Sequence, residues 1–162
     1  MTTSWKKPLV SSLLFVSACV LVVSTMVTPT LARPDFGVRG GAYSEEEEAF
    51  LGAEALFSID DAQHWFGNPN LEHTFLDEGD LDTASFDFHY DFASNRSYTW
   101  WAGGGPTLIF RDGAGSQDSE TDAGVNLLMG LGDKSGDVRP YGQMKVIVSD
   151  DTEAVLAAGI RF

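Results

Sequence analysis

The sequence is short of cysteine, of basic residues and of helical periodicity, and each shortage excludes a class of protein. Its one cysteine, Cys19, lies near the N-terminus, so a chain cleaved after Ala32 has neither a disulfide framework nor a catalytic thiol. Only 10 Lys and Arg residues oppose 24 Asp and Glu residues, giving a net charge of −14. So acidic a chain repels phosphates and contains no basic stripe, which excludes nucleic-acid binding.

The first 32 residues have the layout of a Sec-type signal peptide. Lys6 and Lys7 precede an apolar run from Leu9 to Val27, and Thr30 and Ala32 place small residues where a signal peptidase cleaves. We therefore expect residues 1–32 to be a signal peptide and residues 33–162 to be the exported domain. Removal of the signal leaves 8 basic and 24 acidic residues, so the mature chain is even more acidic.

Two other readings of this segment stay open. The apolar run approaches the roughly 20 residues that span a bilayer, so the segment is alternatively a permanent membrane anchor. Val16-Ser17-Ala18-Cys19 also resembles a lipoprotein cleavage box, which would leave Cys19 as a lipidated N-terminus. The apolar run continues past Cys19, where a lipoprotein turns polar, and this favours cleavage after Ala32.

After Ala32, apolar residues recur at every second position in stretches of about ten residues, which predicts strands and no helix. Turn residues separate the stretches. The eight expected strands are Asp35 to Ser44, Ala49 to Ile59, Trp65 to Phe75, Asp82 to Phe92, Tyr98 to Arg111, Thr121 to Gly132, Val138 to Ser149 and Glu153 to Phe162.

The alternation gives each strand one apolar and one polar face. In the fourth strand, Phe86 and Phe88 share a face, whereas Asp87 and His89 share the other. The polar faces are rich in glycine and carry both signs of charge, which suits the crowded interior of a narrow barrel better than a solvated surface. Strands of about ten residues tilted by roughly 45° are also what a bilayer requires. We predict an all-β, eight-stranded antiparallel up-and-down transmembrane β-barrel.

Charged residues of the inward faces are expected to form an ionic network. Asp87, His89 and Asp91 also have a spacing that suits a metal or acid–base chemistry. We favour ion pairing, because buried charges must be paired, and we expect neither a metal nor a cofactor. The predicted members of the network are Arg39, Glu54, Asp87, His89, Asp91, Asp122, Lys145 and Arg161.

Placing both chain ends in the periplasm gathers aromatic residues at one level. Such a ring of aromatics is typical of a membrane interface. The predicted periplasmic girdle consists of Phe36, Trp65, Phe92, Tyr98 and Trp100, with Phe162 at the same level. The connections at the opposite end are acidic. They are either simply solvated, which we favour, or a site for divalent cations that bridge to lipopolysaccharide phosphates.

The last strand carries the most specific motif. An aromatic residue ends the chain, and apolar residues stand at alternate positions before it: Phe162, Ile160, Ala158, Leu156 and Ala154. Together with the eight strands, this resembles the small outer-membrane barrels of Gram-negative bacteria, the family of the outer membrane protein A transmembrane domain and outer membrane protein X. The resemblance implies that the motif is an insertion signal read by the barrel-assembly machinery.

We therefore expect a monomeric, non-enzymatic outer-membrane protein in contact with lipid and lipopolysaccharide, serving envelope integrity or surface interaction through short acidic loops. Eight strands leave an interior just filled by side chains, so no aqueous pore is expected. A lateral opening for a small apolar molecule is an alternative, at Asn68-Pro69-Asn70, where we expect a bulge. The others are a lipid-A-modifying enzyme using Ser85 and His89, and a soluble periplasmic lipocalin-like barrel.

Overall fold

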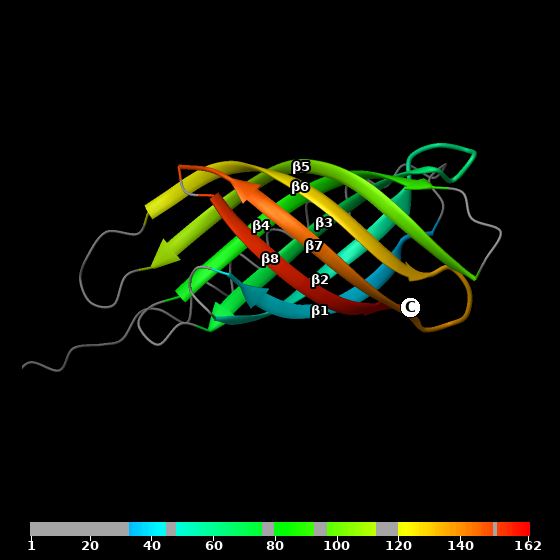
Figure 1. Ribbon diagram of the computed structural model, residues 1–162, viewed down its shortest axis with the longest axis horizontal. Helices are drawn as coiled ribbons and strands as arrows, with labels where there is room; N and C mark the ends of the chain where they lie inside the picture. The colour runs from blue at the N-terminus through cyan, green and yellow to red at the C-terminus, as the bar shows by residue number, and fades with distance from the viewer. Residues whose placement is uncertain (1–32, 45–47, 76–79, 93–96, 113–119, 151) are drawn as a thin grey trace, which may run out of the picture. The chain divides into compact units, whose positions relative to one another are not determined.

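Eight antiparallel strands make up the described part of the chain, as the computed structural model shows (Figure 1). It describes residues 33–44, 48–75, 80–92, 97–112, 120–150 and 152–162; the expected signal peptide lies outside them. Every strand bound falls within two residues of the prediction. No helix in these ranges is long and apolar enough to cross a membrane. The strands are β1 (Asp35–Tyr43), β2 (Ala49–Ser58), β3 (Trp65–Phe75), β4 (Asp80–Phe92), β5 (Tyr98–Asp112), β6 (Glu120–Asp133), β7 (Arg139–Val148) and β8 (Thr152–Arg161).

The strands follow one another around a closed barrel, in which each pairs with its neighbours in sequence and β1 pairs with β8. Along the closing seam the register runs from Gly37 opposite Arg161 to Tyr43 opposite Val155. Phe36 and Phe162 extend the seam by exchanging two backbone hydrogen bonds, of 3.2 and 2.9 Å. Closure leaves none of the eight described strands at an edge of the sheet.

The two faces of the wall are arranged as the alternation predicts. In β6, Leu127 and Leu131 are 60% and 53% exposed on the outside, whereas Asn126 is fully buried inside. In β4, Asp87 and His89 are buried in the lumen and Phe88 lies outside. Large apolar side chains therefore cover the exterior, whereas charged and polar side chains are buried in the interior, the reverse of a water-soluble barrel.

The bulge expected at Asn68-Pro69-Asn70 is absent, and this prediction is wrong. β3 pairs with β4 without interruption, with Asn68 opposite Asp87 and Asn70 opposite Ser85. The alternation holds because Pro69 takes an outward position and both asparagines point inward. The turn-forming composition of this triplet predicted a bulge, but pairing with β4 keeps the strand regular in spite of local propensity.

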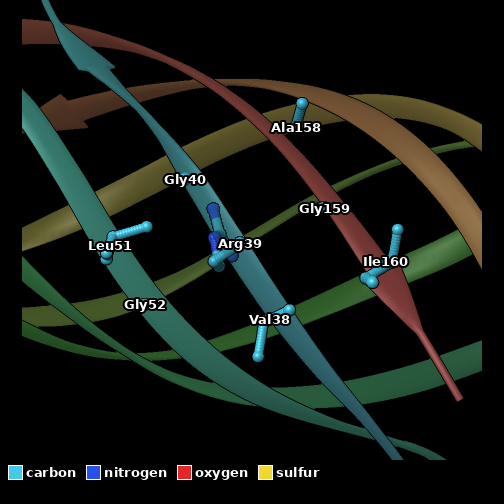
Figure 2. Close-up of a pocket in the computed structure, with 8 residues that line it drawn as sticks. All are labelled: Val38, Arg39, Gly40, Leu51, Gly52, Ala158, Gly159 and Ile160. Atoms are coloured by element: carbon cyan, nitrogen blue, oxygen red, sulfur yellow. The ribbon is translucent and has the colours of Figure 1, made fainter.

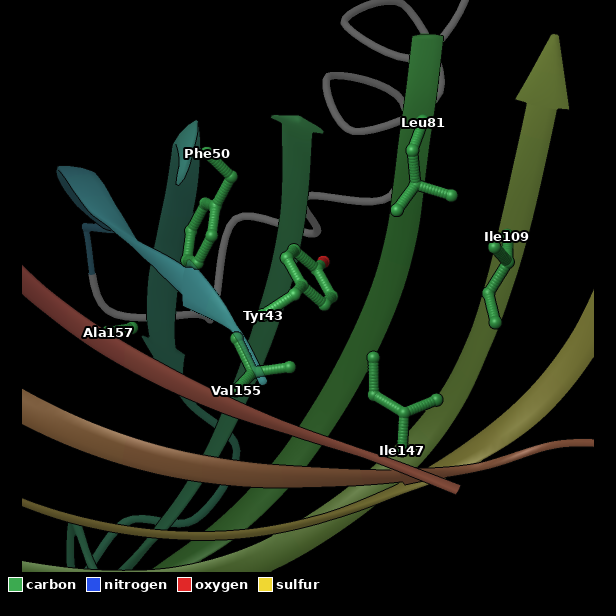
Figure 3. Close-up of a cluster of buried hydrophobic side chains, with 7 residues drawn as sticks. All are labelled: Tyr43, Phe50, Leu81, Ile109, Ile147, Val155 and Ala157. Atoms are coloured by element: carbon green, nitrogen blue, oxygen red, sulfur yellow. The ribbon is translucent and has the colours of Figure 1, made fainter. Parts of the chain in front are cut away.

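The lumen is packed in layers. We call one end of the barrel the loop end, because the segments joining β1 to β2, β3 to β4, β5 to β6 and β7 to β8 connect there; the opposite end is the turn end. Near the loop end, an apolar plug closes the lumen (Figure 3). On the turn-end side of the apolar plug lie charged and amide side chains. Trp101, Leu128 and Tyr141 form a second apolar cluster. The apolar plug consists of Tyr43, Phe50, Leu81, Ile109, Ile147, Val155 and Ala157.

Candidate functional site

Five buried charged side chains form a continuous chain of ion pairs across the lumen. Arg161 Nε lies 2.7 Å from Glu54 Oε1, and Arg39 Nη1 lies 3.6 Å from Glu54 Oε2. Arg39 Nη2 also lies 3.0 Å from Glu72 Oε1, and Lys145 Nζ lies 2.9 Å from Glu72 Oε2. These residues come from β8, β2, β1, β3 and β7. The ionic chain therefore ties together strands from both sides of the closing seam.

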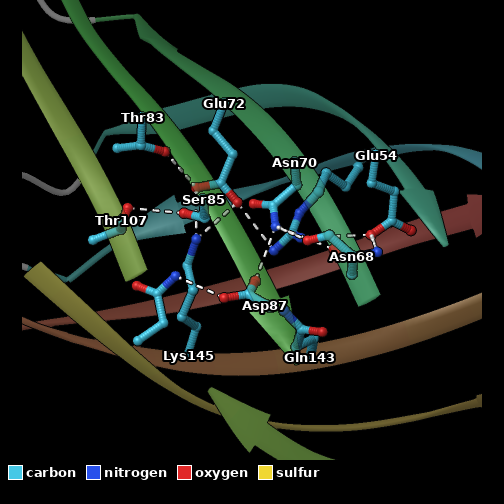
Figure 4. A network of polar contacts seen from close by, with 12 residues as sticks. Glu54, Asn68, Asn70, Glu72, Thr83, Ser85, Asp87, Thr107, Gln143 and Lys145 are labelled. Atoms are coloured by element: carbon cyan, nitrogen blue, oxygen red, sulfur yellow. Dashed lines mark hydrogen bonds and ion pairs between the residues drawn. The ribbon is translucent and has the colours of Figure 1, made fainter. Parts of the chain in front are cut away.

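Glu72 also connects the ionic chain to the apolar plug. The Tyr43 hydroxyl donates a hydrogen bond of 2.6 Å to Glu72 Oε2, and the Thr83 hydroxyl donates one of 3.1 Å to the same oxygen. With Arg39 and Lys145, four side chains thus contact this carboxylate. Figure 4 shows two of them, Thr83 and Lys145, beside Glu72. Glu72 was not among the predicted network residues, although it lies on the inward face with Asn68 and Asn70.

Asp87 is held by amides instead of by a cation. Asn126 Nδ2 donates to Asp87 Oδ1 and Asn70 Nδ2 donates to Oδ2, both at 2.9 Å. Figure 4 shows Asn70 beside Asp87. Three cations and two carboxylates form the ionic chain, so it carries one excess positive charge. The buried carboxylate of Asp87 balances that charge from a greater distance, since Coulomb attraction reaches beyond contact in a poorly polarisable interior.

The remaining predicted network residues lie nearer the barrel ends. His89 stacks between Phe66 and Trp101, with ring centroids 5.6 Å from each, and its Nε2 lies 3.4 Å from Asp91 Oδ1. Asp122 does not join the buried ionic chain. It pairs instead with Arg111 at 2.8 Å near the loop end, where both side chains are partly exposed. Alternation predicts that a side chain points into the barrel but not how far along the barrel axis it lies. The sequence therefore placed Asp122 inside without showing that it lies too near the loop end to reach the buried ionic chain.

The lumen does not bring together Ser85 and His89, the two candidate residues of the enzyme alternative. Ser85 Oγ shares a hydrogen bond of 2.8 Å with Thr107 Oγ1. His89 is four residues further along the same strand, which is about 13 Å. Within the described ranges, no three His, Cys, Asp or Glu side chains gather closely enough to hold a metal ion.

The outer wall places the predicted girdle aromatics at the turn end. Phe36, Trp65 and Trp100 are exposed there, as is Phe162. Phe92 stacks on Trp100 with centroids 3.9 Å apart, and Tyr98 begins β5 at the same end. Tyr90 was not predicted but belongs to this group, because its ring lies 5.2 Å from that of Trp65 and 5.3 Å from that of Phe92.

The side chains of the expected insertion motif all lie on the outside of β8. Leu156, Ile160 and Phe162 are exposed, and Ala154 and Ala158 share their face. Recognition of these residues by the barrel-assembly machinery remains a prediction. Gly40 opens a shallow apolar depression in the wall beside this strand, bordered by Val38, Leu51, Ala158 and Ile160 (Figure 2).

Comparison with known proteins identifies the fold. No family model and no curated protein matches the sequence. Among solved structures, the N-terminal β-barrel domain of Pseudomonas aeruginosa OprF matches 80% of this chain and 98% of its own, with 12% identity and a TM-score of 0.62. Neisserial surface protein A matches 79% of this chain and 94% of its own, with 15% identity and a TM-score of 0.62.

The outer membrane enzyme PagL matches 79% of this chain and 98% of its own, with 14% identity and a TM-score of 0.54. The similar structures therefore include an enzyme, so the shared architecture alone does not decide whether this chain catalyses a reaction. With a closed barrel, an apolar outer wall and a filled polar lumen, the chain has the fold of the small eight-stranded outer-membrane β-barrels.

Proposed function

We propose that this chain is an integral protein of the bacterial outer membrane, with a sealed lumen, that serves envelope integrity or surface interaction. The apolar exterior supports the membrane placement, because a wall with residues as exposed as Leu127 and Leu156 requires lipid around it. The likeness to outer-membrane barrels supports the same placement.

The filled lumen is the observation that carries this proposal. The ionic chain crosses the barrel, and the apolar plug closes it nearer the loop end. An ion entering from the turn end meets paired charges, and an ion entering from the loop end meets side chains that exclude water. Two seals in series argue against passage of solutes through the lumen and leave the outer wall and the loops as the surfaces that contact other molecules.

Strong acidity of the chain limits the partners that its loops would accept. The net charge of −14 disfavours polyanions and favours neutral or cationic surfaces. Several acidic loop positions, among them residues 45–47 and 76–79, lie outside the described ranges. Divalent cations at these loops, contact with lipopolysaccharide and a monomeric state remain part of the proposal.

Electrical recordings test whether the lumen is sealed. We expect the refolded wild-type barrel to produce no conductance steps in planar lipid bilayers. The double variant F50A/L81A removes two large side chains of the apolar plug but keeps the ionic chain, so it should stay silent as well if the two seals act in series. Regular conductance steps from the wild-type protein would show that the lumen is a pore.

Lateral access of a small apolar molecule is a second candidate, supported by gaps in the wall pairing. Between β2 and β3, Glu54 pairs with Asn70 and Phe57 pairs with Gly67, but the two positions between them are unpaired. A matching gap lies between β4 and β5, opposite Gly105 and Pro106. Apolar molecules entering here would meet the polar side chains of Asn68 and Asp87, which is the physical argument against this candidate.

Fluorescence of Trp101 separates the two candidates. Trp101 is buried in the lumen, whereas Trp65 and Trp100 lie on the outer wall. In a mature W65F/W100F variant, Trp101 is the remaining tryptophan, and lipids brominated on their acyl chains should leave it unquenched if the wall stays shut. Strong quenching would show that acyl chains enter the lumen and would favour lateral access. The wild type, with two tryptophans in lipid, is the positive control.

A further inference from the structure

An apolar groove crosses the outer wall on both sides of the closing seam. Gly40 of β1 lies opposite Ala158 of β8, and Ala158 lies opposite Gly142 of β7, so three small residues stand side by side on the outside. Leu51 pairs with Gly40 at one end of this row, and Leu131 pairs with Gly142 at the other. We call the whole row the seam groove; the depression around Gly40 in Figure 2 is part of it.

The seam groove is open along its floor. Among the described residues, a Cβ atom placed on Gly142 would meet no atom within 4 Å. A Cβ atom on Gly40 would meet its nearest neighbours, Leu51 Cδ2 and a backbone oxygen, at 3.3 Å. The rims stand four residues apart along a strand, about 13 Å, which leaves room for one alkyl chain between them. Exposed apolar side chains form these rims, with Val38 and Ile160 toward the turn end and Leu156 and Met144 toward the loop end.

The seam groove slopes from the turn end toward the middle of the wall. Its members lie progressively farther from the turn-end bound of their own strand: Leu131 two residues, Gly142 and Ala158 three, Gly40 five and Leu51 seven. The row spans four strand spacings, about 19 Å, and rises by about 12 Å across a membrane at the usual strand tilt. A molecule lying in the groove would thus have one end at the turn-end membrane interface and the other among acyl chains.

Charges of both signs stand at the turn-end mouth of the groove. Lys134 follows the last residue of β6, just beyond Leu131, and is exposed. Asp133 and Asp137 are exposed on either side of it. By contrast, residues 59–64, which join β2 to β3 at the same end, contain two aspartates and no lysine or arginine. One cation between two carboxylates suits a headgroup that carries both a phosphate and an ammonium.

We propose that the seam groove binds one acyl chain of a zwitterionic phospholipid, whose phosphate contacts Lys134 and whose ammonium contacts the neighbouring aspartates. This inference rests on the proposed membrane placement, which surrounds the outer wall with lipid. Lipid tails are as apolar as the wall, so transfer from water contributes nothing to the preference. The preference comes from packing of an alkyl chain into the groove and from the headgroup contacts.

Other occupants fit this surface less well. The convex wall of a second copy of the chain is too broad for a groove that has the width of one alkyl chain. A free fatty acid would place its carboxylate beside Asp133 and Asp137, where like charges repel. An anionic phospholipid has the phosphate for Lys134 but no ammonium for the aspartates.

Native mass spectrometry tests the proposal. The chain would be expressed at full length in a Gram-negative host, purified from the outer membrane in detergent and titrated with dioleoylphosphatidylethanolamine. We expect one bound lipid, held more tightly than dioleoylphosphatidylglycerol, which lacks the ammonium, and more tightly than oleate. G142L places a side chain on the open floor of the groove and should weaken binding by about tenfold, because the alkyl chain loses its contact surface.

Two more variants locate the site. K134Q removes the cation at the mouth and should weaken binding by about threefold, the order expected of an exposed ion pair. A123L is the matched control for G142L, because it adds the same side chain at an exposed position of β6 outside the groove, and it should leave binding unchanged. Each variant must show the heat-dependent gel shift of a folded barrel.

The outcomes also separate this inference from the membrane placement on which it rests. A chain that is recovered from the outer membrane and shifts on the gel, but binds the lipid equally well as G142L, overturns the groove site alone. The same holds if K134Q binds as tightly as the wild type, if oleate or the anionic lipid binds more tightly, or if a dimer forms in place of the lipid complex. A chain absent from the outer membrane would overturn the membrane placement and the groove site together.

Discussion

Glu72 is the residue on which the buried charges of the lumen converge. Its carboxylate contacts Arg39 and Lys145 and accepts hydrogen bonds from Tyr43 and Thr83. A carboxylate in a filled lumen cannot be replaced by water when it is lost. Its removal therefore leaves two cations without their closest counter-charge.

The variant E72Q should destabilise the barrel by about 3–5 kcal/mol, because breaking a buried ion pair leaves an uncompensated charge. Urea unfolding in lipid vesicles, followed by the gel shift, would measure the change. D122N is the matched control: it removes a carboxylate that pairs with Arg111 near the loop end, where both side chains are partly exposed. The loss there should be at most about 1 kcal/mol. Equal losses from both variants would contradict the central role of Glu72.

Residue by residue, alternation predicted which side chains enter the lumen better than it predicted their partners. It placed Arg39, Glu54, Lys145 and Arg161 inside, where the structure joins them in one ionic chain. It missed Glu72, because the preceding asparagines and proline suggested an interrupted strand. Which inward side chains contact one another also depends on how far along the barrel axis each one lies. This position follows from the stagger between neighbouring strands, so the sequence of a single strand does not predict it.

At the scale of the strands, two prolines weaken the backbone pairing of the barrel wall. The backbone N–H of Ile59 donates a hydrogen bond to the carbonyl of Trp65. In an antiparallel pair, hydrogen-bonded positions recur at every second residue, so Ala55 and Pro69 also face each other at a hydrogen-bonded position. Pro69 has no N–H, so the carbonyl of Ala55 loses that donor. Pro106 produces the corresponding gap against Phe86 between β4 and β5.

Amide hydrogen exchange should reveal these gaps as local weak points. The variant P69A supplies an N–H opposite Ala55 and should slow exchange in peptides from β2 and β3, by an amount corresponding to about 1 kcal/mol for one new hydrogen bond. P106A should do the same for β4 and β5. Each variant is the control for the other, since P69A should leave exchange between β4 and β5 unchanged and P106A should leave exchange between β2 and β3 unchanged. If neither variant alters hydrogen exchange in its own strand pair, the prolines do not limit the backbone pairing of these strands.

The strand bounds followed closely from the two-residue period, but the apolar plug did not. In the sequence, Ile147 shares its face of the strand with Gln143 and Lys145, and one apolar residue on a polar face predicts no cluster. The apolar plug forms because Tyr43, Phe50 and Leu81 on other strands reach the same height. Such an assembly arises from closure of the whole sheet, and no single element contains it.

For the whole molecule, closure is the property on which the other features depend. Ion pairs straddle the seam between β1 and β8: Arg161 of β8 reaches Glu54 of β2, and Arg139 of β7 reaches Asp35 of β1 at 2.7 Å. The charges of the lumen thus hold together strands that are distant in sequence. Opening of this seam would break these pairs and expose backbone groups to lipid, so the open form is strongly disfavoured.

Substitution of Ala158 tests this closure without altering a lumen side chain. Backbone bonds join Phe36 to Phe162 and Ser44 to Ala154, so the alternating ladder also puts Ala158 opposite Gly40 in a hydrogen-bonded pair. A158P removes that donor and should lower the temperature at which the gel shift is lost, whereas A158V keeps it and adds an apolar side chain facing lipid. Both variants should be expressed at full length in a Gram-negative host and compared with the wild type.

We expect the wild type and A158V in the outer-membrane fraction, resistant to detergent until heated, because a closed sheet offers no edge from which to unravel. If A158P resists heat as well as A158V does, the seam contributes little to the barrier against unfolding. A wild-type chain found in the aqueous fraction would show that its exposed apolar wall is covered by something other than lipid. The two results are distinguishable, because the first concerns the strength of closure and the second concerns the membrane placement itself.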